Sequence, residues 1–340
     1  MKVLQVIDRV EAGGAERVFL DMTEMLIDKG VQVETLCISA KGKLYDKIDS
    51  RAKTHFLNRR NKFSISTMWR CAKLCANFDL IHVHMRHTYG YVRLAQLISL
   101  KKFKIIFHDH FSLNHVPFNL KSIFKPTYYI GVCMHNIEWA RNNLYLNPSN
   151  IFLLSNTIKR KVFNDVPNKL VDSIVIVSNI RPIKNIELAI NVAEKMNKKM
   201  TIIGNNYDLS YYNLLNSKIS LNNNIEILQN IENVQFELLK HTLGLHTSNS
   251  ETGPLVLLEY LAQGLPFVAY QTGEVAHVLK EIIPQCFVNS LDENEWIEAI
   301  KNIEQNPPSA AYLKSLFETY FGPEKYINQC LAIYQQVVNS

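Results

Sequence analysis

The chain repeats one pattern along its length: a short apolar run, a polar or glycine-containing turn, and then an amphipathic segment. Residues 2–10, 31–37 and 78–84 are such runs in the first half, and residues 173–178 and 200–204 follow in the second. Short apolar runs that alternate with helical segments are typical of parallel strands buried on both faces. The pattern therefore predicts an α/β fold built from Rossmann-like, doubly wound parallel sheets.

The pattern restarts after a polar, proline-bearing stretch at residues 163–169, which we interpret as a linker. A chain of 340 residues is long for one ordinary domain, and each half is large enough to bury its own core. We therefore predict two Rossmann-like domains, at residues 1–165 and 166–323. The last segment, at about residues 324–340, has the apolar spacing of an amphipathic helix.

The composition is that of a globular protein. Apolar residues make up 47% of the chain and charged residues 20%, and no apolar run approaches the ~18 residues that cross a bilayer. The N-terminus has the pattern of a strand rather than of a signal peptide. The six cysteines are scattered without metal-ligand spacing, so we expect buried, reduced thiols in a cytoplasmic protein.

The net charge of +6 is unevenly distributed. Residues 1–165 carry 25 Lys and Arg against 13 Asp and Glu, whereas residues 166–340 carry 12 against 18. Basic clusters accompanied by aromatic side chains favour an anionic membrane surface as a partner, with an ordinary lysine-rich surface as the alternative. A nucleic-acid partner is disfavoured because no recognition motif is present. The clusters lie at residues 59–62, 101–104 and 159–161, and the aromatic residues among them are Phe63, Trp69, Phe103, Phe118 and Phe124.

In the second half, residues 250–264 combine two carboxylates with the start of an apolar helix. Pro254 suits the first helical position, where its missing N–H costs nothing, and Gly264 suits the position after the helix end. Glu251 would then precede a helix N-terminus, which attracts phosphate, and Glu259 would lie inside the helix. Such carboxylates would bind neutral groups beside the phosphate, such as sugar hydroxyls. The alternative is a capped core helix with two solvated glutamates.

Two further turns have the composition of ligand-binding turns. Arg181 and Lys184 lie between the strand at residues 173–178 and the next helix, where two cations and the helix dipole would hold an anion. Gly13 and Gly14 follow the first strand and would let a ligand approach the backbone. Their spacing differs from the G-x-G-x-x-G fingerprint, which disfavours a nicotinamide cofactor.

Eight of the eleven histidines fall in the first half, and four of them form two H-x-H pairs, each on one strand face. A zinc site is conceivable, but each pair would need a third ligand, and no Glu-x-x-His or cysteine companion exists. We therefore expect no metal. The pairs are His82 with His84 and His108 with His110. His82 is expected in the core, whereas His110, at a strand tip, has the stronger claim to chemistry.

Together these features resemble the glycosyltransferases of the GT-B fold, specifically the large retaining family 4. The resemblance runs along nearly the whole chain. Residues 13–17, Gly-Gly-Ala-Glu-Arg, are similar to the N-terminal turn of that family. Residues 178–185 resemble its G-R-x-x-x-x-K-G segment and align the family lysine with Lys184. Glu251 and Glu259 match its E-x7-E pair.

The resemblance implies a nucleotide-diphosphate sugar as donor, bound mostly by the second domain. Lys184 would neutralise the diphosphate, Glu251 would bind hydroxyls of the sugar, and Glu259 would hold the ribose. Backbone groups of three further residues would meet the phosphate or the sugar. These residues are Gly253, Pro254 and Leu255.

In the first domain, the resemblance implies that Gly13 and Gly14 approach the donor and that His110 lines the reaction centre. It also implies that the C-terminal helix crosses back onto the first domain. The family arginine aligns with Asn179. Arg181, two residues later, would reach the phosphates in its place.

The implied reaction is retaining transfer of a sugar to a hydroxyl of a glycan or lipid-linked acceptor, in surface-polysaccharide or glycoconjugate biosynthesis. No Asp-x-Asp pair is present, so neither a metal nor another cofactor is expected. The basic first domain would bring a cytoplasmic enzyme to the inner face of the cell membrane. A sugar-nucleotide 2-epimerase of the same fold and a non-catalytic nucleotide-sugar-binding protein are the alternatives. The choice between UDP and GDP stays open.

Overall fold

The computed structural model describes most of the chain. The described residues are 1–61, 64–111, 122–165, 167–220 and 222–340. Three members of the basic and aromatic clusters lie outside them: Lys62, Phe63 and Phe118.

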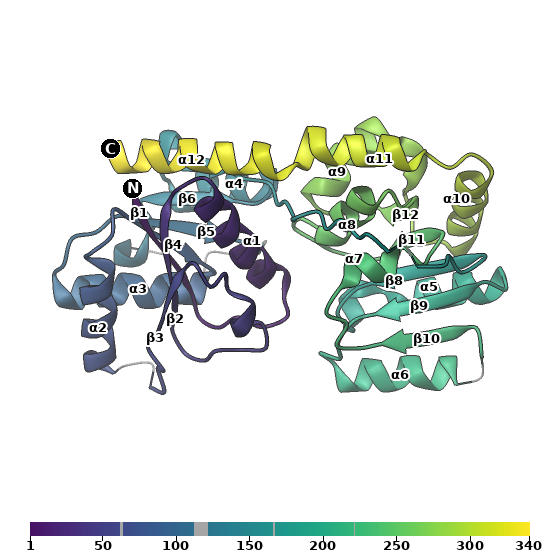
Figure 1. The fold of residues 1–340 in the computed structure, drawn as a ribbon, viewed down its shortest axis with the longest axis horizontal. Coiled ribbons are helices and arrows are strands. Elements are labelled where there is room, and N and C mark those ends of the chain that lie inside the picture. Colours follow the sequence, from purple (N-terminus) through teal and green to yellow (C-terminus); the bar gives the residue numbers. More distant parts are fainter. Residues whose placement is uncertain (62–63, 112–121, 166, 221) are drawn as a thin grey trace. The chain divides into compact units, whose positions relative to one another are not determined.

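Two compact units make up the chain (Figure 1). One is formed by Met1–Ile158 together with Pro323–Ser340, and the other by Lys159–Gly322. The first unit thus ends before the boundary that the sequence suggested at residue 165. The stretch interpreted as a linker, residues 163–169, lies within the second unit, and the C-terminal segment belongs to the first.

The first unit is built on a parallel sheet of seven strands in the order β3-β2-β1-β4-β5-β6-β7. Helices cover both faces, which explains why the central strands are apolar on both sides. The strands are β1 Lys2–Ile7, β2 Gln32–Cys37, β3 Lys53–Phe56, β4 Leu80–His84, β5 Ile105–Asp109, β6 Tyr128–Gly131 and β7 Ile151–Leu153. The helices are α1 Gly14–Asp28, α2 Ile65–Cys75, α3 Arg86–Ser99, α4 Met134–Leu144 and α12 Pro323–Asn339.

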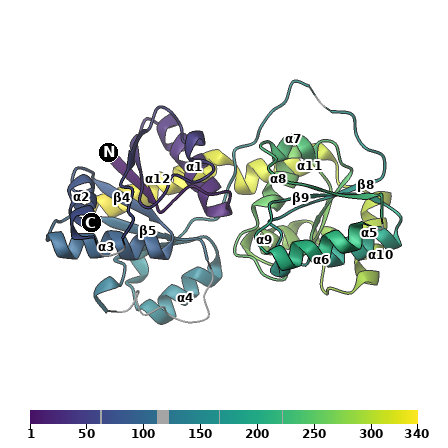
Figure 2. The ribbon, with the colours of Figure 1, turned by 90° about the horizontal axis from the view of Figure 1, so that it is seen from below.

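The C-terminal helix α12 completes the core on one face of this sheet. It packs beside α1, and Figure 2 shows the two helices next to each other. Ile333 and Tyr334 of α12 join one buried apolar cluster with Met22 of α1 and Val3 of β1. Helices α2, α3 and α4 contribute to the cluster on the other face. Removal of α12 would therefore expose the apolar face of the sheet to water.

The second unit has a parallel sheet of six strands in the order β10-β9-β8-β11-β12-β13. The strands are β8 Ser173–Val177, β9 Lys199–Ile203, β10 Ile225–Leu228, β11 Leu243–His246, β12 Phe267–Tyr270 and β13 Phe287–Val288. The helices are α5 Ile186–Lys195, α6 Leu209–Ile219, α7 Val234–Leu238, α8 Leu255–Gln263, α9 Glu274–Ile282, α10 Glu293–Gln305 and α11 Ala310–Leu316.

Both sheets reverse their strand order beside their first strand. In the first unit β1 lies between β2 and β4, and in the second β8 lies between β9 and β11. In open parallel sheets, ligands bind outside the carboxyl ends of the strands at this reversal. The predicted fold class, two Rossmann-like doubly wound domains, is confirmed.

Two other expectations concern the membrane and the cysteines. Within the described residues, no helix combines the length and the hydrophobicity needed to cross a bilayer. All six cysteines are buried, and none of them forms a disulfide.

Candidate functional site

The cationic turn of the second unit follows β8 at the reversal of strand order. Pro182–Lys184 form one turn of 3-10 helix, and Asn185 then adopts a left-handed conformation with φ of +49° before α5 begins. The segment after β11 holds this turn from the other side. The Thr247 hydroxyl donates to the Lys184 carbonyl over 2.9 Å, and the Asn249 N–H donates to the Ile183 carbonyl over 2.9 Å. The backbone that carries Lys184 is thus tied to the end of β11.

The loop that carries Glu251 is fixed by the turn after β12. The Glu251 N–H donates to the Thr272 hydroxyl over 3.0 Å, and the Glu274 N–H donates to the Thr252 carbonyl over 2.8 Å. Gly273 has φ of +83°, and a Cβ there would lie 2.7 Å from Cδ of Pro254. Only glycine allows this close approach without strain. Three loops therefore define the position of Glu251.

Lys184 and Glu251 form an ion pair across the reversal, since Nζ of Lys184 donates to Oε1 of Glu251. Their side chains are 20% and 18% exposed, so each charge is partly removed from water and still reachable by a ligand. The sequence predicted the two residues as separate ligand contacts, and the structure brings them together. A ligand with an anionic group and a neutral hydroxyl can replace this ion pair. The lysine then binds the anion, and the carboxylate accepts a hydrogen bond from the hydroxyl.

Helix α8 begins directly after this loop. Leu255 is its first residue, so Pro254 is the N-cap rather than the first helical residue that the sequence suggested. Gly253 and Leu255 can still offer backbone N–H groups at the N-terminus. Glu259 lies in the same helix and is buried, with 5% of its surface exposed. Gly264 ends the helix in a left-handed conformation with φ of +69°, as expected for the residue after the last turn.

Arg181 and Asn179 lie beside this turn in a different environment. The Arg181 side chain is exposed, and its guanidinium lies over the ring of Tyr207, 4.6 Å from the centroid. Tyr207 follows β9, and its ring is also partly exposed. Asn179 is half-buried, and its carbonyl accepts from the Ser178 hydroxyl. The structure therefore brings Arg181 to an aromatic ring next to the reversal.

His246 is a residue that sequence reasoning passed over. It ends β11, is 3% exposed, and lies near both charges of the Lys184–Glu251 pair. Burial lowers the pKa of His246 to about 4, the Glu251 carboxylate acts in the opposite direction, and the Lys184 ammonium adds to the lowering. The imidazole is therefore neutral beside the ion pair at ordinary pH. Its only signal in the sequence is its position at the carboxyl end of a strand.

In the first unit, Gly13 and Gly14 lie at the start of α1. Gly13 is the N-cap and Gly14 the first helical residue. A Cβ on Gly13 would lie 2.3 Å from Oε2 of Glu16. The Glu16 carboxylate therefore packs against this turn, and burial raises the pKa of Glu16. A side chain at position 13 would therefore require the Glu16 carboxylate to move away from the turn.

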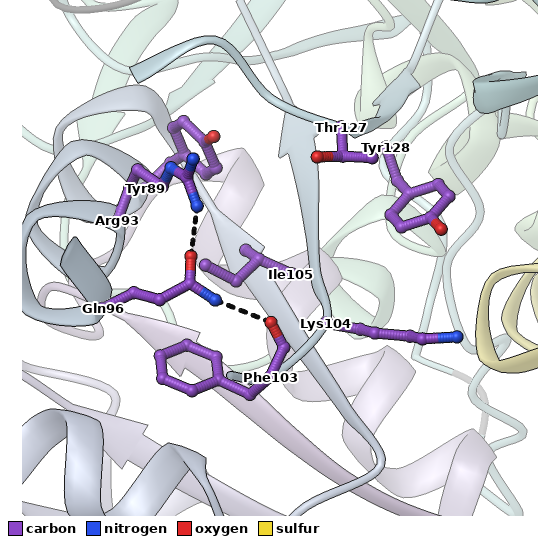
Figure 3. Close-up of a pocket in the computed structure, with 8 residues that line it drawn as sticks. All are labelled: Tyr89, Arg93, Gln96, Phe103, Lys104, Ile105, Thr127 and Tyr128. Carbon is purple, nitrogen blue, oxygen red and sulfur yellow. Dashed lines mark hydrogen bonds between the residues drawn. The ribbon is translucent and has the colours of Figure 1, made fainter. Parts of the chain in front are cut away.

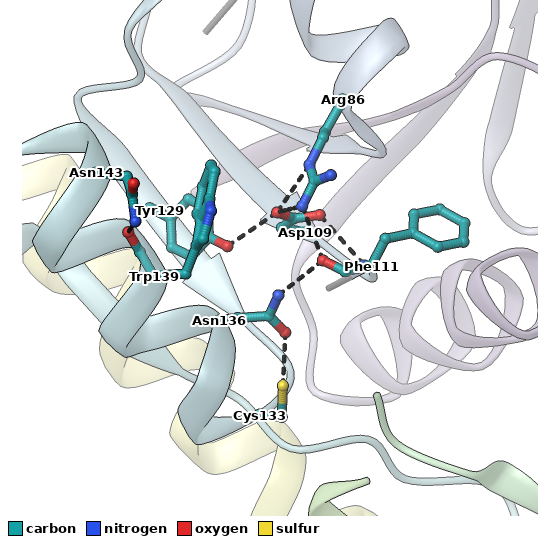
Figure 4. A network of polar contacts seen from close by, with 8 residues as sticks. All are labelled: Arg86, Asp109, Phe111, Tyr129, Cys133, Asn136, Trp139 and Asn143. Carbon is teal, nitrogen blue, oxygen red and sulfur yellow. Dashed lines mark hydrogen bonds and ion pairs between the residues drawn. The ribbon is translucent and has the colours of Figure 1, made fainter. Parts of the chain in front are cut away.

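His110 directly follows β5 and is 7% exposed. Its Nε2 lies 3.0 Å from Nδ1 of His84, and burial lowers the pKa of His110 to about 3. A neutral imidazole in this position can accept or donate a hydrogen bond but does not act as a cation at ordinary pH. Figure 4 shows a neighbouring network at the same end of the sheet, centred on Asp109.

This network holds the backbone at Phe111 (Figure 4). Asp109 is fully buried and accepts from Nε and Nη2 of Arg86 over 3.0 and 2.6 Å, and from the Tyr129 hydroxyl over 2.9 Å. The Phe111 carbonyl accepts from Arg86 and from Nδ2 of Asn136, each over 2.8 Å. Burial raises the pKa of Asp109, and Arg86 acts in the opposite direction. The network thus fixes the chain where it leaves β5.

The cavity in Figure 3 lies at the opposite end of the strands in the same sheet. It has a volume of about 220 Å³ and is lined by the first residues of β5 and β6, Ile105 and Tyr128. A second hollow of about 340 Å³ shares Arg93, Gln96 and Phe103 with it. Because these hollows lie at the amino ends of the strands, they are separate from the predicted site residues of this unit.

Comparison with solved structures shows the same fold in several proteins. HepE from Anabaena, solved with UDP-glucose, matches with a TM-score of 0.83 and 15% identity over 100% of both chains. A glycosyltransferase from Rickettsia africae matches with 0.81 and 17% identity over 100% of this chain and 99% of that one. A TarM variant from S. aureus, solved with fondaparinux, α-GlcNAc-glycerol and UDP, matches with 0.76 and 13% identity over 98% and 100%. None of the curated proteins is matched by this sequence.

Two family models match successive parts of the chain. The model for Glycosyltransferase Family 4 matches residues 12–171, and the model for Glycosyl transferases group 1 matches residues 159–315. With two Rossmann-like units, the chain has the GT-B fold of these solved structures. The chain belongs to these glycosyltransferases and is of the family 4 type. The resemblance to GT-B glycosyltransferases of the family 4 type, stated from the sequence, is confirmed.

Proposed function

We propose that this glycosyltransferase moves a sugar from a nucleotide-diphosphate donor to a hydroxyl group, with retention of the anomeric configuration. The observation that carries the proposal is the Lys184–Glu251 pair at the reversal of strand order in the second unit. A nucleotide sugar presents a diphosphate next to sugar hydroxyls, which are the two groups that a lysine and a carboxylate bind. HepE and the TarM variant were solved with uridine nucleotides, which supports UDP-sugars as the first donors to test.

In this proposal, different residues of the second unit bind different parts of the donor. Lys184 and the N–H groups at the start of α8 stabilise the negative charge of the departing phosphate. Glu251, released from Lys184 by the diphosphate, accepts from hydroxyls of the sugar. Glu259 accepts from the ribose, and Arg181 supplies the second cation in place of an arginine at Asn179.

In the first unit, Gly13 and Gly14 are proposed to approach the donor, and His110 is proposed to line the reaction centre that the acceptor hydroxyl enters. The hydroxyl attacks the anomeric carbon from the side of the leaving phosphate, whose oxygen takes the proton as the old bond breaks. The configuration is then retained. Since protein groups stabilise the phosphate, the reaction is proposed to need neither a metal nor a cofactor.

A donor panel tests the proposal without knowledge of the acceptor. We expect one nucleotide sugar to raise the melting temperature and to be slowly hydrolysed, and Lys184→Ala and Glu251→Ala to reduce turnover on the order of 10²-fold or more. Lys195→Ala, an exposed lysine paired with Glu293, is the matched control. NMR of the released or transferred sugar reads the configuration. Full activity of either site variant contradicts the assignment, and formation of an epimer would favour the 2-epimerase alternative.

The acceptor is proposed to be lipid-linked or a glycan of the cell surface, with the enzyme at the cytoplasmic face of the membrane. The support is a basic and apolar surface after α3. Leu100 is 87% exposed in a left-handed conformation, and Lys101 and Lys102 follow it around the hollow that contains Phe103. An apolar side chain flanked by two lysines suits an anionic bilayer, where the lysines meet phosphates and the leucine enters the interface.

Vesicle sedimentation tests this surface. We expect binding to vesicles of phosphatidylcholine and phosphatidylglycerol, and weaker binding at high salt, because each lysine near an anionic surface contributes about 1 kcal/mol. Reversing two charges with Lys101→Glu and Lys102→Glu should abolish binding. The control reverses two charges in the second unit, with Lys199→Glu and Lys301→Glu. Equal loss in both double variants would contradict a specific surface.

A further inference from the structure

Four histidines of the first unit form one buried cluster. His82 and His84 lie on β4, His108 lies on β5, and His110 follows it directly; all point to the face that α1 and α12 cover. The register places His84 opposite His108. The first three are 0% exposed and His110 is 7% exposed. The two H-x-H pairs are separate in the sequence but lie together in the fold. Each pair therefore has the imidazoles of the other beside it as further possible ligands.

The ring nitrogens of the cluster face one another in two close pairs. Nε2 of His82 lies 3.0 Å from Nδ1 of His108, and Nδ1 of His84 lies 3.0 Å from Nε2 of His110. The rings of His82 and His84 are stacked, with centroids 4.5 Å apart. Nitrogens from neighbouring strands thus converge on one small volume.

The outer nitrogen of His84 has a partner that suits a metal ligand. Nε2 of His84 lies 2.6 Å from Oε1 of Gln5 on β1, and an amide oxygen can only accept. With the Gln5 amide in this orientation, His84 carries its hydrogen on Nε2 and turns the lone pair of Nδ1 toward the centre of the cluster. A metal-ligating histidine has this arrangement, because its second nitrogen donates to a carbonyl-type oxygen.

His82 repeats the arrangement with a partner from α12. Nδ1 of His82 lies 2.6 Å from the Tyr334 hydroxyl, and that hydroxyl donates to Sδ of Met22 over 3.9 Å. The Tyr334 oxygen can also accept from Nδ1 of His82, and Nε2 of His82 then presents a lone pair to the centre. Tyr334 is thus placed to hold His82 as a ligand, as Gln5 is placed to hold His84.

The spacing suits a small ion. One nitrogen each of His82, His84 and His108 can be chosen so that all lie within 4.8 Å of one another. An ion at the centre of three such atoms is at most about 2.8 Å from each, so inward shifts of about 0.7 Å reach the 2.0–2.1 Å of a zinc–imidazole bond. Among the described residues, Nε2 of His108 has no hydrogen-bond partner although it is buried. The cluster therefore has a nitrogen that its hydrogen bonds leave unused.

We propose that this cluster binds one divalent transition-metal ion, with His82, His84 and His108 as ligands and His110 beside the fourth position. An all-imidazole set selects zinc and its neighbours cobalt, nickel and copper over magnesium or calcium. The ion joins β4 to β5 and, through Tyr334, stabilises the docking of α12. The ion is structural and belongs to the first unit, and no step of the proposed transfer reaction uses it.

Metal analysis of the full-length, tag-free chain tests the proposal. We expect about one zinc per chain after purification, and a lower melting temperature after chelation that added Zn²⁺ restores. Cobalt in place of zinc should give the visible absorption of a tetrahedral nitrogen site. Protein that contains no metal, and that neither gains stability from Zn²⁺ nor gives this band with Co²⁺, would show a metal-free hydrogen-bonded cluster and overturn the proposal.

Variants separate binding from folding. Gln5→Leu and Tyr334→Phe leave all four histidines in place, and each should weaken zinc binding about 10- to 100-fold, as loss of an outer partner does. His84→Gln should remove the stoichiometric metal. His135→Gln and His277→Gln change histidines outside the cluster and should leave one zinc per chain. If metal binding follows His135 or His277 instead, the cluster is not the site.

Discussion

At the scale of single residues, His246 links the candidate site to pH. Its folded-state pKa of about 4 lies below the ordinary 6.5, chiefly through burial, so the unfolded chain binds the proton more readily. Above pH 6.5 the side chain is neutral in both the folded and the unfolded state, so its protonation does not lower the free energy of unfolding. Stability of the second unit is lost as the pH falls from about 6.5 to 4, by on the order of 3 kcal/mol at the lower end.

Urea unfolding at pH 7 and pH 4.5 measures this effect. Replacement by an apolar residue of similar size, His246→Leu, should reduce the difference in unfolding free energy between the two pH values. Glu251 and Lys184 are the charged groups near the imidazole, and they remain in both proteins. An unchanged pH dependence in the variant would show that other groups cause the loss.

The two charges at the reversal were accessible to sequence reasoning because each follows an apolar strand. Lys184 and Glu251 lie in turns between a strand and a helix, at the carboxyl ends of the strands, where open parallel sheets bind their ligands. Their mutual ion pair was not predictable, since it depends on the spatial order of β8 and β11. His246 was missed for a related reason: within an apolar run, a histidine resembles an ordinary core residue.

At the scale of elements, helix α8 depends on the glycine that follows it. Gly264 has φ of +69°, and a Cβ there would lie 2.8 Å from Cβ and 2.9 Å from the carbonyl oxygen of Ala310 in α11. Gly264→Ala should therefore combine left-handed strain with overpacking and lower the unfolding free energy by about 2–4 kcal/mol.

Gly30 provides the matched control for this change. It also follows a helix with positive φ, +77°, but a Cβ there would meet nothing within 4 Å. Gly30→Ala should therefore show strain alone, about 1–2 kcal/mol. Thermal melts of both variants make the comparison. Similar losses would mean that the contact with α11 has no cost of its own.

The types and order of the elements followed from the sequence, whereas their ends did not. Alternating apolar runs predicted the strands because both faces of each sheet are buried. Helix α1 begins at Gly14, and its N-cap Gly13 has ordinary extended backbone with φ of −113°. Pro254 takes the N-cap rather than the first turn because the loop is held by Thr272 and Gly273. Such boundaries are set by contacts distant in sequence.

At the scale of the whole molecule, the two units differ in continuity. Residues 159–322 form one uninterrupted segment with its own sheet, and we expect this segment to fold when expressed alone. Residues 1–158 lack α12, whose Tyr334 and Ile333 fill the core of the first unit. Alone, that fragment should aggregate or remain partly unfolded.

Complementation measures this dependence. A peptide of residues 323–340 added to the 1–158 fragment should restore cooperative melting, whereas the same peptide with Tyr334→Asp should not. Circular dichroism and size-exclusion chromatography follow both mixtures. Cooperative folding of residues 1–158 without the peptide would show that α12 is dispensable for the first core.

The return of α12 to the first unit also has a consequence for synthesis on the ribosome. Chains emerge from the N-terminus, and domains ordinarily fold in that order. Here the residues that close the first core are translated after the whole of the second unit. The second unit can finish folding while the first still exposes one apolar face, so the nascent chain must be protected from aggregation until α12 has left the ribosome.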